Sequence, residues 1–207
     1  MWSIALVGAL CFVQGCSQDG DVRTDEVWAI DLQTYGHEVE ETLTDLDLPR
    51  NHFELRLIAW LEVYFRGVDI DFFIGDEFDR AQVSSICLRH GDTTRLGRGI
   101  LDIGNDNPVH DCGSPDGTQH GVFVNRLEGI YEAQVEPGMT REQRADLFAR
   151  IVSIALAHEI GHGIGLEHSI ADFGDGDIMK ASPILLATIN HFFHNAHFEL
   201  LQNSVVR

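Results

Sequence analysis

The chain has 207 residues, of which 44% are hydrophobic, enough for one sizeable core and little more. Lysine and arginine total 14 against 33 aspartate and glutamate residues, so the formal net charge is −19. This acidity excludes a nucleic-acid partner, because contact with phosphates needs a basic surface. We therefore expect a single acidic, monomeric domain.

The first sixteen residues, MWSIALVGALCFVQGC, are uncharged and largely apolar. An apolar run this short is typical of an export signal and too short for a membrane-spanning helix. The end of the run, VQGC, resembles the lipobox of bacterial lipoproteins, in which the chain is cut before the cysteine and the new terminus is lipidated. We expect a signal peptide over residues 1–15, lipid on Cys16 and a polar tether over residues 16–26. The protein would be exported and anchored to the cell envelope by this lipid alone; a freely secreted protein or a retained segment are the alternatives.

Two cysteines remain for the folded part, Cys87 and Cys112, if Cys11 leaves with the signal and Cys16 carries the lipid. A pair of cysteines in an exported domain predicts a disulfide. Two buried free thiols are the alternative.

Apolar periodicity and turn formers predict an α+β domain over residues 27–207. The longest helix begins after Thr140, which forms a capping-box pattern with Gln143, and runs without proline to Gly163. In chain order we expect a strand over 27–35, a helix over 50–67, strands over 68–75, 84–90, 97–104 and 121–127 around a long loop at 105–120, the long helix, and a C-terminal helix over 184–206.

The stretch HEIGHGIGLEH, which begins at His158, carries the chemistry. His158 and His162 are four residues apart, so on a helix their Cβ atoms lie about 6 Å apart on one face and both rings can bind one metal ion. A catalytic zinc takes three protein ligands and keeps a fourth position open. Gly163 and Gly165 can adopt the left-handed backbone that ends a helix, which would return His168 to the same ion.

Glu159 follows the first predicted ligand, so its carboxylate is expected beside the metal rather than on it. Zinc lowers the pKa of a bound water to about 7. Glu159 is then placed to take the proton as the hydroxide attacks a carbonyl, and to pass it to the leaving amine. The predicted reaction is hydrolysis of a peptide bond. Glu167, the other glutamate of the stretch, is expected to be a solvated surface residue.

This stretch resembles the zinc signature of the metzincin metallopeptidases, with the pattern His158-Glu159-x-x-His162-x-x-Gly165-x-x-His168. The resemblance implies a mixed five-stranded sheet with two long helices, one catalytic zinc, and endopeptidase activity on protein or peptide substrates. It also implies a methionine in a tight turn beneath the metal, for which Met179 is the candidate. Ser169, directly after the third histidine, is similar to the matrixin branch of this family.

Two further features of matrixins, a structural zinc and the cysteine switch, have less close counterparts in this sequence. A second, structural zinc would use His90, Asp92, His110 and His120, and the acidic turns DIGNDN and DFGDGD are candidate calcium sites. The segment CGSPD, which begins at Cys112, resembles the matrixin cysteine switch, but it falls inside the domain, so a disulfide or a structural turn is the preferred interpretation.

Two functions compete with a peptidase. One is a non-catalytic zinc-binding or adhesion module of the same fold, against which Glu159 argues, because a purely structural site has no use for that carboxylate. The other is zinc-dependent hydrolysis of a substrate that is not a protein.

Overall fold

The computed structural model describes residues 26–75, 77–91, 95–99, 108–112, 119–169, 176–180, 190–195, 197 and 199. The expected signal peptide over 1–15 and the lipidation site Cys16 lie outside these residues. So does the expected tether, except for Glu26, which already belongs to the first strand. In the part of the chain that is described, no helix combines the length and apolar character needed to cross a bilayer.

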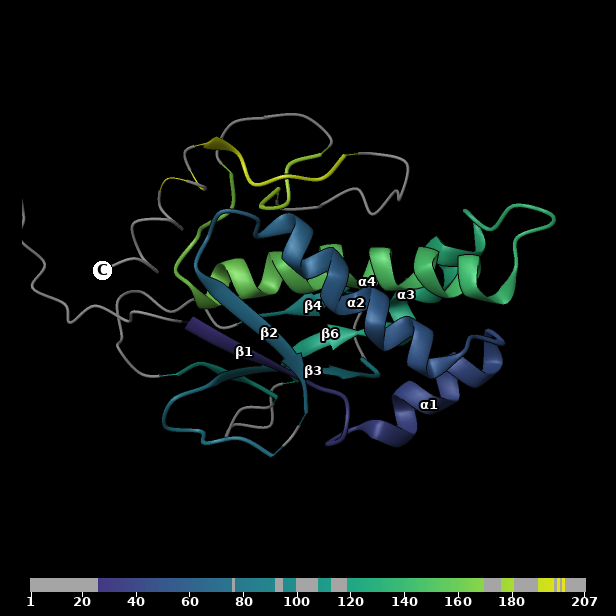
Figure 1. Cartoon of the computed structure of the whole chain (residues 1–207), viewed down its shortest axis with the longest axis horizontal. Helices are drawn as coiled ribbons and strands as arrows, with labels where there is room; N and C mark the ends of the chain where they lie inside the picture. The colour runs from purple at the N-terminus through teal and green to yellow at the C-terminus, as the bar shows by residue number, and fades with distance from the viewer. Residues whose placement is uncertain are drawn as a thin grey trace, which may run out of the picture.

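A mixed, mostly parallel sheet forms the centre of the domain (Figure 1). Its strands are β1 (Glu26–Asp31), β2 (Ile70–Ile74), β3 (Ser84–Arg89), β4 (Gly97–Arg98), β5 (His110–Asp111) and β6 (Gly121–Phe123). The spatial order is β2-β1-β3-β6-β4, and β5 also pairs with β3. One edge of β3 pairs with β1. Its other edge pairs first with β5 and then with β6, so these two short strands follow one another in the same position of the sheet. Only β4, at the end of this order, is antiparallel to its neighbour.

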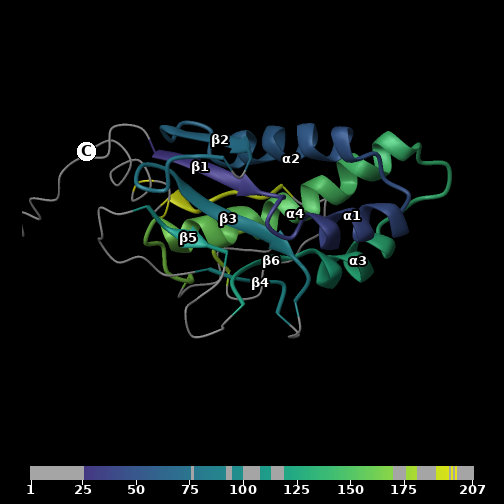
Figure 2. The ribbon, with the colours of Figure 1, turned by 90° about the horizontal axis from the view of Figure 1, so that it is seen from below.

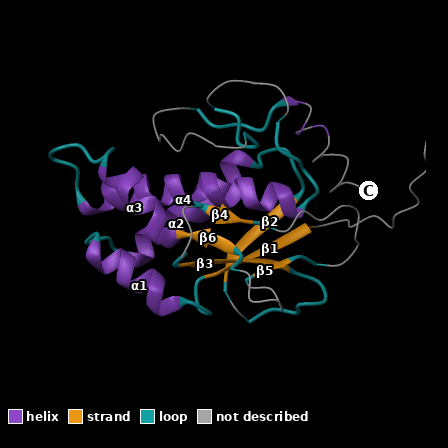
Figure 3. Ribbon diagram, turned by 180° about the vertical axis from the view of Figure 1, so that it is seen from behind, coloured by secondary structure: helices purple, strands orange, loops and turns teal. Residues whose placement is uncertain are grey.

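Four helices accompany the sheet in the described residues: α1 (Gly36–Asp45), α2 (Arg50–Tyr64), α3 (Val124–Glu132) and α4 (Arg141–Gly163). The two long helices, α2 and α4, run side by side and contact each other extensively (Figure 1). Turned views place α1 and α3 together at one end of the molecule (Figures 2 and 3). A continuous apolar core fills the space between the sheet and the long helices. The expected combination of a mixed sheet and two long helices is confirmed.

The start of α4 follows the sequence prediction. The Thr140 hydroxyl accepts a hydrogen bond from the Gln143 backbone N–H at 3.2 Å, and the Gln143 side chain accepts one from the Thr140 N–H at 2.8 Å. This reciprocal capping box satisfies two of the backbone donors that a helix start leaves unpaired. From Ile151 to Gly161 every residue of α4 is buried, so the helix is held by packing along most of its length.

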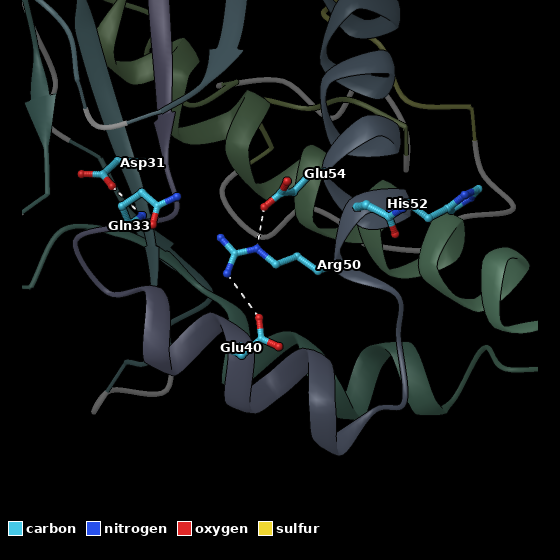
Figure 4. Close-up of polar contacts among 7 residues, drawn as sticks. Asp31, Gln33, Glu40, Arg50, His52 and Glu54 are labelled. Atoms are coloured by element: carbon cyan, nitrogen blue, oxygen red, sulfur yellow. Dashed lines mark hydrogen bonds and ion pairs between the residues drawn. The ribbon is translucent and has the colours of Figure 1, made fainter.

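The junction between α1 and α2 is fixed by one arginine. Arg50 opens α2, and its guanidinium pairs with Glu40 of α1 at 3.2 Å and with Glu54, one turn further along α2, at 2.7 Å (Figure 4). Arg50 and Glu54 are partly buried and Glu40 is exposed, so these pairs contribute little to stability.

Three sequence expectations need correction. The strand expected over 121–127 ends at Phe123, and α3 begins at Val124, because Val124, Leu127 and Tyr131 form a buried stripe with helical spacing. The loop expected over 105–120 contains β5. Of the strand expected over 97–104, the described residues form a strand only at Gly97–Arg98.

The C-terminal helix expected over 184–206 is also wrong as a single element. Residues 190–194 are not helical, and Phe192 forms an isolated parallel bridge with Asp177. Asn195, His197 and Glu199 are helical, while residues 181–189 and 200–207 lie outside the described part of the chain.

The predicted disulfide is present. The sulfur atoms of Cys87 and Cys112 lie at the bonding distance of 2.07 Å, which joins β3 to the residue after β5. Neither a pair of free thiols nor a cysteine switch fits this arrangement, because Cys112 has no thiolate to offer a metal. Cys87 of β3 pairs in register with Asp31 of β1, so their side chains lie on the same sheet face. Trp28, three residues before Asp31 in β1, faces α4. Side chains alternate along a strand, so the disulfide lies on the sheet face opposite to α4.

Candidate metal centre

Three imidazole rings converge where α4 ends. His158 and His162 lie one turn apart in the last part of the helix, and His168 follows the turn that ends it. The Nε2 atom of His168 is 3.2 Å from Nε2 of His162 and 3.3 Å from Nε2 of His158. The ring nitrogens of all three residues lie within 4.8 Å of one another.

This spacing fits a single tetrahedral zinc ion. Two imidazole nitrogens that each bind zinc at about 2.0–2.1 Å, at a tetrahedral angle, are themselves about 3.3 Å apart. The two measured Nε2 separations, 3.2 and 3.3 Å, match this value. Three histidines leave the fourth position of a tetrahedral site open, as a catalytic zinc requires. His168 is exposed, so the group of three histidines is accessible to solvent at this residue.

In two of the three histidines, Nδ1, the ring nitrogen that faces away from the centre of the site, is hydrogen-bonded to a backbone carbonyl. His158 Nδ1 donates a hydrogen bond to the Ile178 carbonyl at 2.6 Å, and His162 Nδ1 donates one to the Leu166 carbonyl at 2.7 Å. A carbonyl oxygen can only accept, so Nδ1 carries the proton in both rings. Each Nε2 therefore presents its lone pair to the centre of the site, which is the usual way in which metal-binding histidines are oriented.

Burial keeps these two rings neutral. Together with repulsion from the neighbouring imidazoles, it lowers the pKa of His158 to about 4. Burial also lowers the pKa of His162. A neutral imidazole can bind a cation, whereas a protonated one cannot, so near pH 7 both rings are in the binding form.

A glycine makes the backbone reversal after α4. Gly165 has a φ of 97°, the left-handed conformation predicted for it. The Leu166 N–H bonds back to the Gly161 carbonyl at 2.8 Å, which closes the end of the helix. Gly163 has another role than the one expected: it is still helical, and a Cβ there would lie 2.5 Å from the Trp28 ring. It is small so that α4 can pack on β1.

Met179 lies in a tight turn against the helix. The Lys180 N–H bonds to the Asp177 carbonyl at 3.3 Å, which closes a turn over residues 177–180. The Met179 side chain is fully buried, and its sulfur would lie 2.6 Å from a Cβ placed on Gly161. Gly161 stands between His158 and His162 in α4, so the methionine packs against the helix between the two predicted ligands.

Sequence reasoning missed what this turn does for the site. Ile178 supplies the carbonyl that orients His158. Asp177 accepts hydrogen bonds from the Met179 N–H at 3.1 Å and from the Ser169 hydroxyl, and the Ser169 N–H donates to the Met179 carbonyl at 2.9 Å. The turn is therefore tied to the residue that follows His168. An aspartate two residues before the methionine is a recognisable Asx-turn signal, whereas the Ile178 and Leu166 carbonyls leave no trace in the sequence.

Glu159 is buried, with 7% of its surface exposed, beside the edge strand. Its two carboxylate oxygens lie against glycines: a Cβ on Gly97 would be 2.5 Å from Oε1, and one on Gly99 would be 2.8 Å from Oε2. Burial, together with the negative charge of Asp111, raises the pKa of Glu159 to about 8. A carboxyl group with a pKa near neutrality can both accept and return a proton. Glu167 is exposed, as expected.

The second zinc site expected from the sequence does not assemble among the described residues. Asp92 and the turn DIGNDN lie outside them, as does DFGDGD apart from its last two residues. The three histidines of that site have separate partners: His90 with Thr42, His110 with Ser85 and the Arg80 carbonyl, and His120 with Asp111. Asp31 lies close to the two cysteines, but their sulfur atoms are bonded to each other and cannot serve as metal ligands.

Comparison with solved structures finds the crystal structure of archaemetzincin from Methanopyrus kandleri, with a TM-score of 0.46 and 15% sequence identity over 89% of this chain and 97% of that chain. No family model and no curated protein matches the sequence. At this level of similarity the comparison assigns no function, and what the site can do follows from its own residues.

Proposed function

We propose that the protein is a zinc-dependent metalloendopeptidase of the metzincin type that cleaves protein or peptide substrates. The observation that carries this proposal is the convergence of three imidazole nitrogens at 3.2 and 3.3 Å. The carboxylate of Glu159, the residue after the first histidine, is buried against Gly97 of β4 and adds support. The N-terminal sequence adds the proposal that the protein works outside the cytoplasm, held at the cell envelope by a lipid on Cys16.

His158, His162 and His168 would hold the ion. When bound, zinc supplies a Lewis acid that polarises a peptide carbonyl and makes water nucleophilic near pH 7. The chain contributes the rest: the Ile178 and Leu166 carbonyls hold two imidazoles in the tautomer that binds, and burial keeps these rings neutral.

Glu159 would move the proton. In its ionised form it accepts a proton from the water that attacks the carbonyl carbon. When the C–N bond breaks, the protonated carboxyl gives this proton to the leaving amine, so the group ends the cycle as it began. A raised pKa favours the second step, and a cation beside the carboxylate favours the ionised form needed for the first.

The edge strand offers a place for an extended peptide. In the described sheet β4 is the last strand, with β6 as its one neighbour, so its outer edge can pair with a further strand. Gly97 of β4 touches Glu159, so a peptide paired there would run past the proposed base.

A pair of glutamine variants tests the function. Glu159→Gln is expected to keep one zinc per chain, measured by elemental analysis, and to lose at least a hundredfold in the hydrolysis of a mixed peptide library followed by mass spectrometry. Glu167→Gln removes the exposed glutamate of the same stretch and should leave the zinc content and the rate of peptide hydrolysis unchanged.

The other outcomes separate the competing functions. A wild-type protein that binds zinc but cuts no peptide would be a non-catalytic zinc-binding module or a hydrolase of another substrate. An active Glu159→Gln variant would refute the proposed base, and a wild-type protein without affinity for zinc would refute the metal site itself.

A further inference from the structure

An extended segment near the C-terminus, residues 190–193, packs on the turn that carries Met179. The Ile178 N–H donates to the Phe192 carbonyl at 3.0 Å, and the Phe192 N–H donates to the Gly176 carbonyl at 2.9 Å. These two bonds form the parallel bridge between Phe192 and Asp177. We call residues 190–193 the bridging segment.

The bridge acts on the same residue that orients the first imidazole. Ile178 donates its N–H to the bridging segment and accepts the His158 Nδ1 proton on its carbonyl, at 2.6 Å. The N–H and C=O of Ile178 belong to the two rigid peptide groups on either side of its Cα, so a shift of the first group displaces the second through the short, hydrogen-bonded turn. The position of the carbonyl that holds His158 therefore depends on a backbone partner that lies outside the zinc motif.

The bridging segment is anchored at the far side by aromatic packing on α2. Phe193 is 5% exposed, and its ring centroid lies 4.9 Å from that of Phe65, the residue that ends α2. His191 is buried as well and meets the Tyr64 ring edge-on at 6.4 Å. Phe192, between them, is exposed. This in-out-in alternation is that of a strand seated on the core.

The fit between the turn and the bridging segment leaves no space for a side chain at Gly176. A Cβ on this residue would lie 2.3 Å from the Asn190 carbonyl oxygen, which is a backbone atom and cannot rotate away. The close approach of the two backbones thus depends on a glycine at position 176.

We propose that the bridging segment positions His158 for metal binding, and that Phe193 is a positioning residue of the metal site although it contacts none of the three histidines. The inference rests on the proposed zinc site. It adds a determinant of metal affinity that follows the third histidine by more than twenty residues and that the HExxH pattern does not contain.

Two phenylalanines that share one neighbour provide a matched test. Phe65 packs on Phe193 at 4.9 Å and on Phe72 of β2 at 5.2 Å, so Phe193→Ala and Phe72→Ala each remove one ring from the same partner. Of these two phenylalanines, Phe193 belongs to the bridging segment, which is hydrogen-bonded to the turn, whereas Phe72 belongs to β2. The full chain is loaded with zinc and its dissociation constant is measured by competition with a chromogenic chelator. The visible spectrum of the cobalt-substituted protein reports the geometry of the ligands.

We expect Phe193→Ala to weaken zinc binding about tenfold or more and to alter the cobalt spectrum, since loss of a group that orients a ligand typically has this effect. Phe72→Ala should change the dissociation constant less than twofold. Phe193→Leu, which refills most of the space, should restore tight binding. Equal zinc affinity of Phe193→Ala and Phe72→Ala would overturn the inference.

A glycine pair covers the case in which Phe193→Ala does not fold. Gly176→Ala should push the bridging segment off the turn and weaken zinc binding. Gly129→Ala is the control, because a Cβ on Gly129 meets nothing within 4 Å. If the wild-type chain binds zinc and Gly176→Ala binds it equally well, the inference fails while the proposed function stands; if the wild-type chain binds no zinc, the proposed function fails first.

Discussion

His158 and Ile178 are twenty residues apart in the chain and joined by a 2.6 Å hydrogen bond from the imidazole Nδ1 to the backbone carbonyl. This bond fixes which nitrogen of His158 carries a proton and which one faces the metal site. It also makes the turn around Met179 part of the site, although no atom of the turn has to touch the ion.

A methyl group on Gly161 should disturb the support of the ligands. Its Cβ would lie 2.6 Å from the sulfur of Met179, so this fully buried side chain would have to shift. We expect Gly161→Ala to destabilise the protein by about 1–3 kcal/mol and to weaken zinc binding about tenfold, measured by urea unfolding and chelator competition. Gly129→Ala, on the open face of α3, should be neutral or slightly stabilising. A Gly161→Ala variant with wild-type zinc affinity would contradict the supporting role of Met179.

A methyl group on Gly97 should disturb the proposed base, Glu159, and leave the proposed zinc site intact. The added Cβ would lie 2.5 Å from Oε1 and 3.0 Å from Cγ of Glu159, so the carboxylate must turn away. We expect Gly97→Ala to lower kcat/KM at least tenfold on any peptide the wild-type protein cuts, a loss of about 1.4 kcal/mol in transition-state stabilisation. Zinc content should stay at one per chain. Loss of zinc in this variant would mean that Glu159 holds the ligands as well.

The parts of the site that could be predicted from the sequence are those set by local geometry. The i, i+4 spacing of His158 and His162 and the capping box at Thr140 depend only on the helix that contains them, and a positive φ at Gly165 is required wherever such a helix must end abruptly. Each of these features is determined by residues within one or two turns of each other.

The parts that could not be predicted depend on packing between distant segments. Every residue has a carbonyl, so no sequence pattern distinguishes the one of Ile178 until the fold brings it to His158. The short helix α1 was missed because its buried stripe consists of Val39, Thr42 and Leu43 among charged residues. The helix α3 was missed because its first turn continues a buried strand. Gly163 must be small because the Trp28 ring lies against it, and only the packing of α4 on the sheet reveals this.

The disulfide should stabilise the fold without affecting the metal site. It closes a loop with a sequence separation of 25 residues, for which the chain-entropy model gives about 3.5 kcal/mol. We expect the Cys87→Ala/Cys112→Ala variant to lose roughly this much free energy of unfolding in urea. Zinc affinity should change less than twofold, because the bond lies on the sheet face away from α4. A large loss of zinc affinity would show that the two faces are coupled.

The pH dependence of the metal-free protein should reveal the buried carboxyl group. Burial raises the pKa of Glu159 from its ordinary 4.5 to about 8. Between these two values the folded protein holds a proton that the unfolded chain has released. The stability that comes from protonated Glu159 is therefore fully present below pH 4.5 and is lost as the pH rises through 8. His158 acts in the opposite direction, since its pKa falls from 6.5 to about 4, but its effect is confined to the acidic side of pH 6.5.

The window from pH 7 to 8 thus isolates the carboxyl group. In the presence of a chelator, the free energy of unfolding of the wild-type protein should fall by on the order of 1 kcal/mol across this window. Glu159→Gln carries no titrating proton there, so its unfolding free energy should stay constant, and Glu167→Gln should behave like the wild type because that side chain is exposed. The measurement is urea unfolding at closely spaced pH values. A wild-type curve as flat as that of Glu159→Gln would mean that Glu159 is ionised in the metal-free protein and that its burial does not tune it for proton transfer.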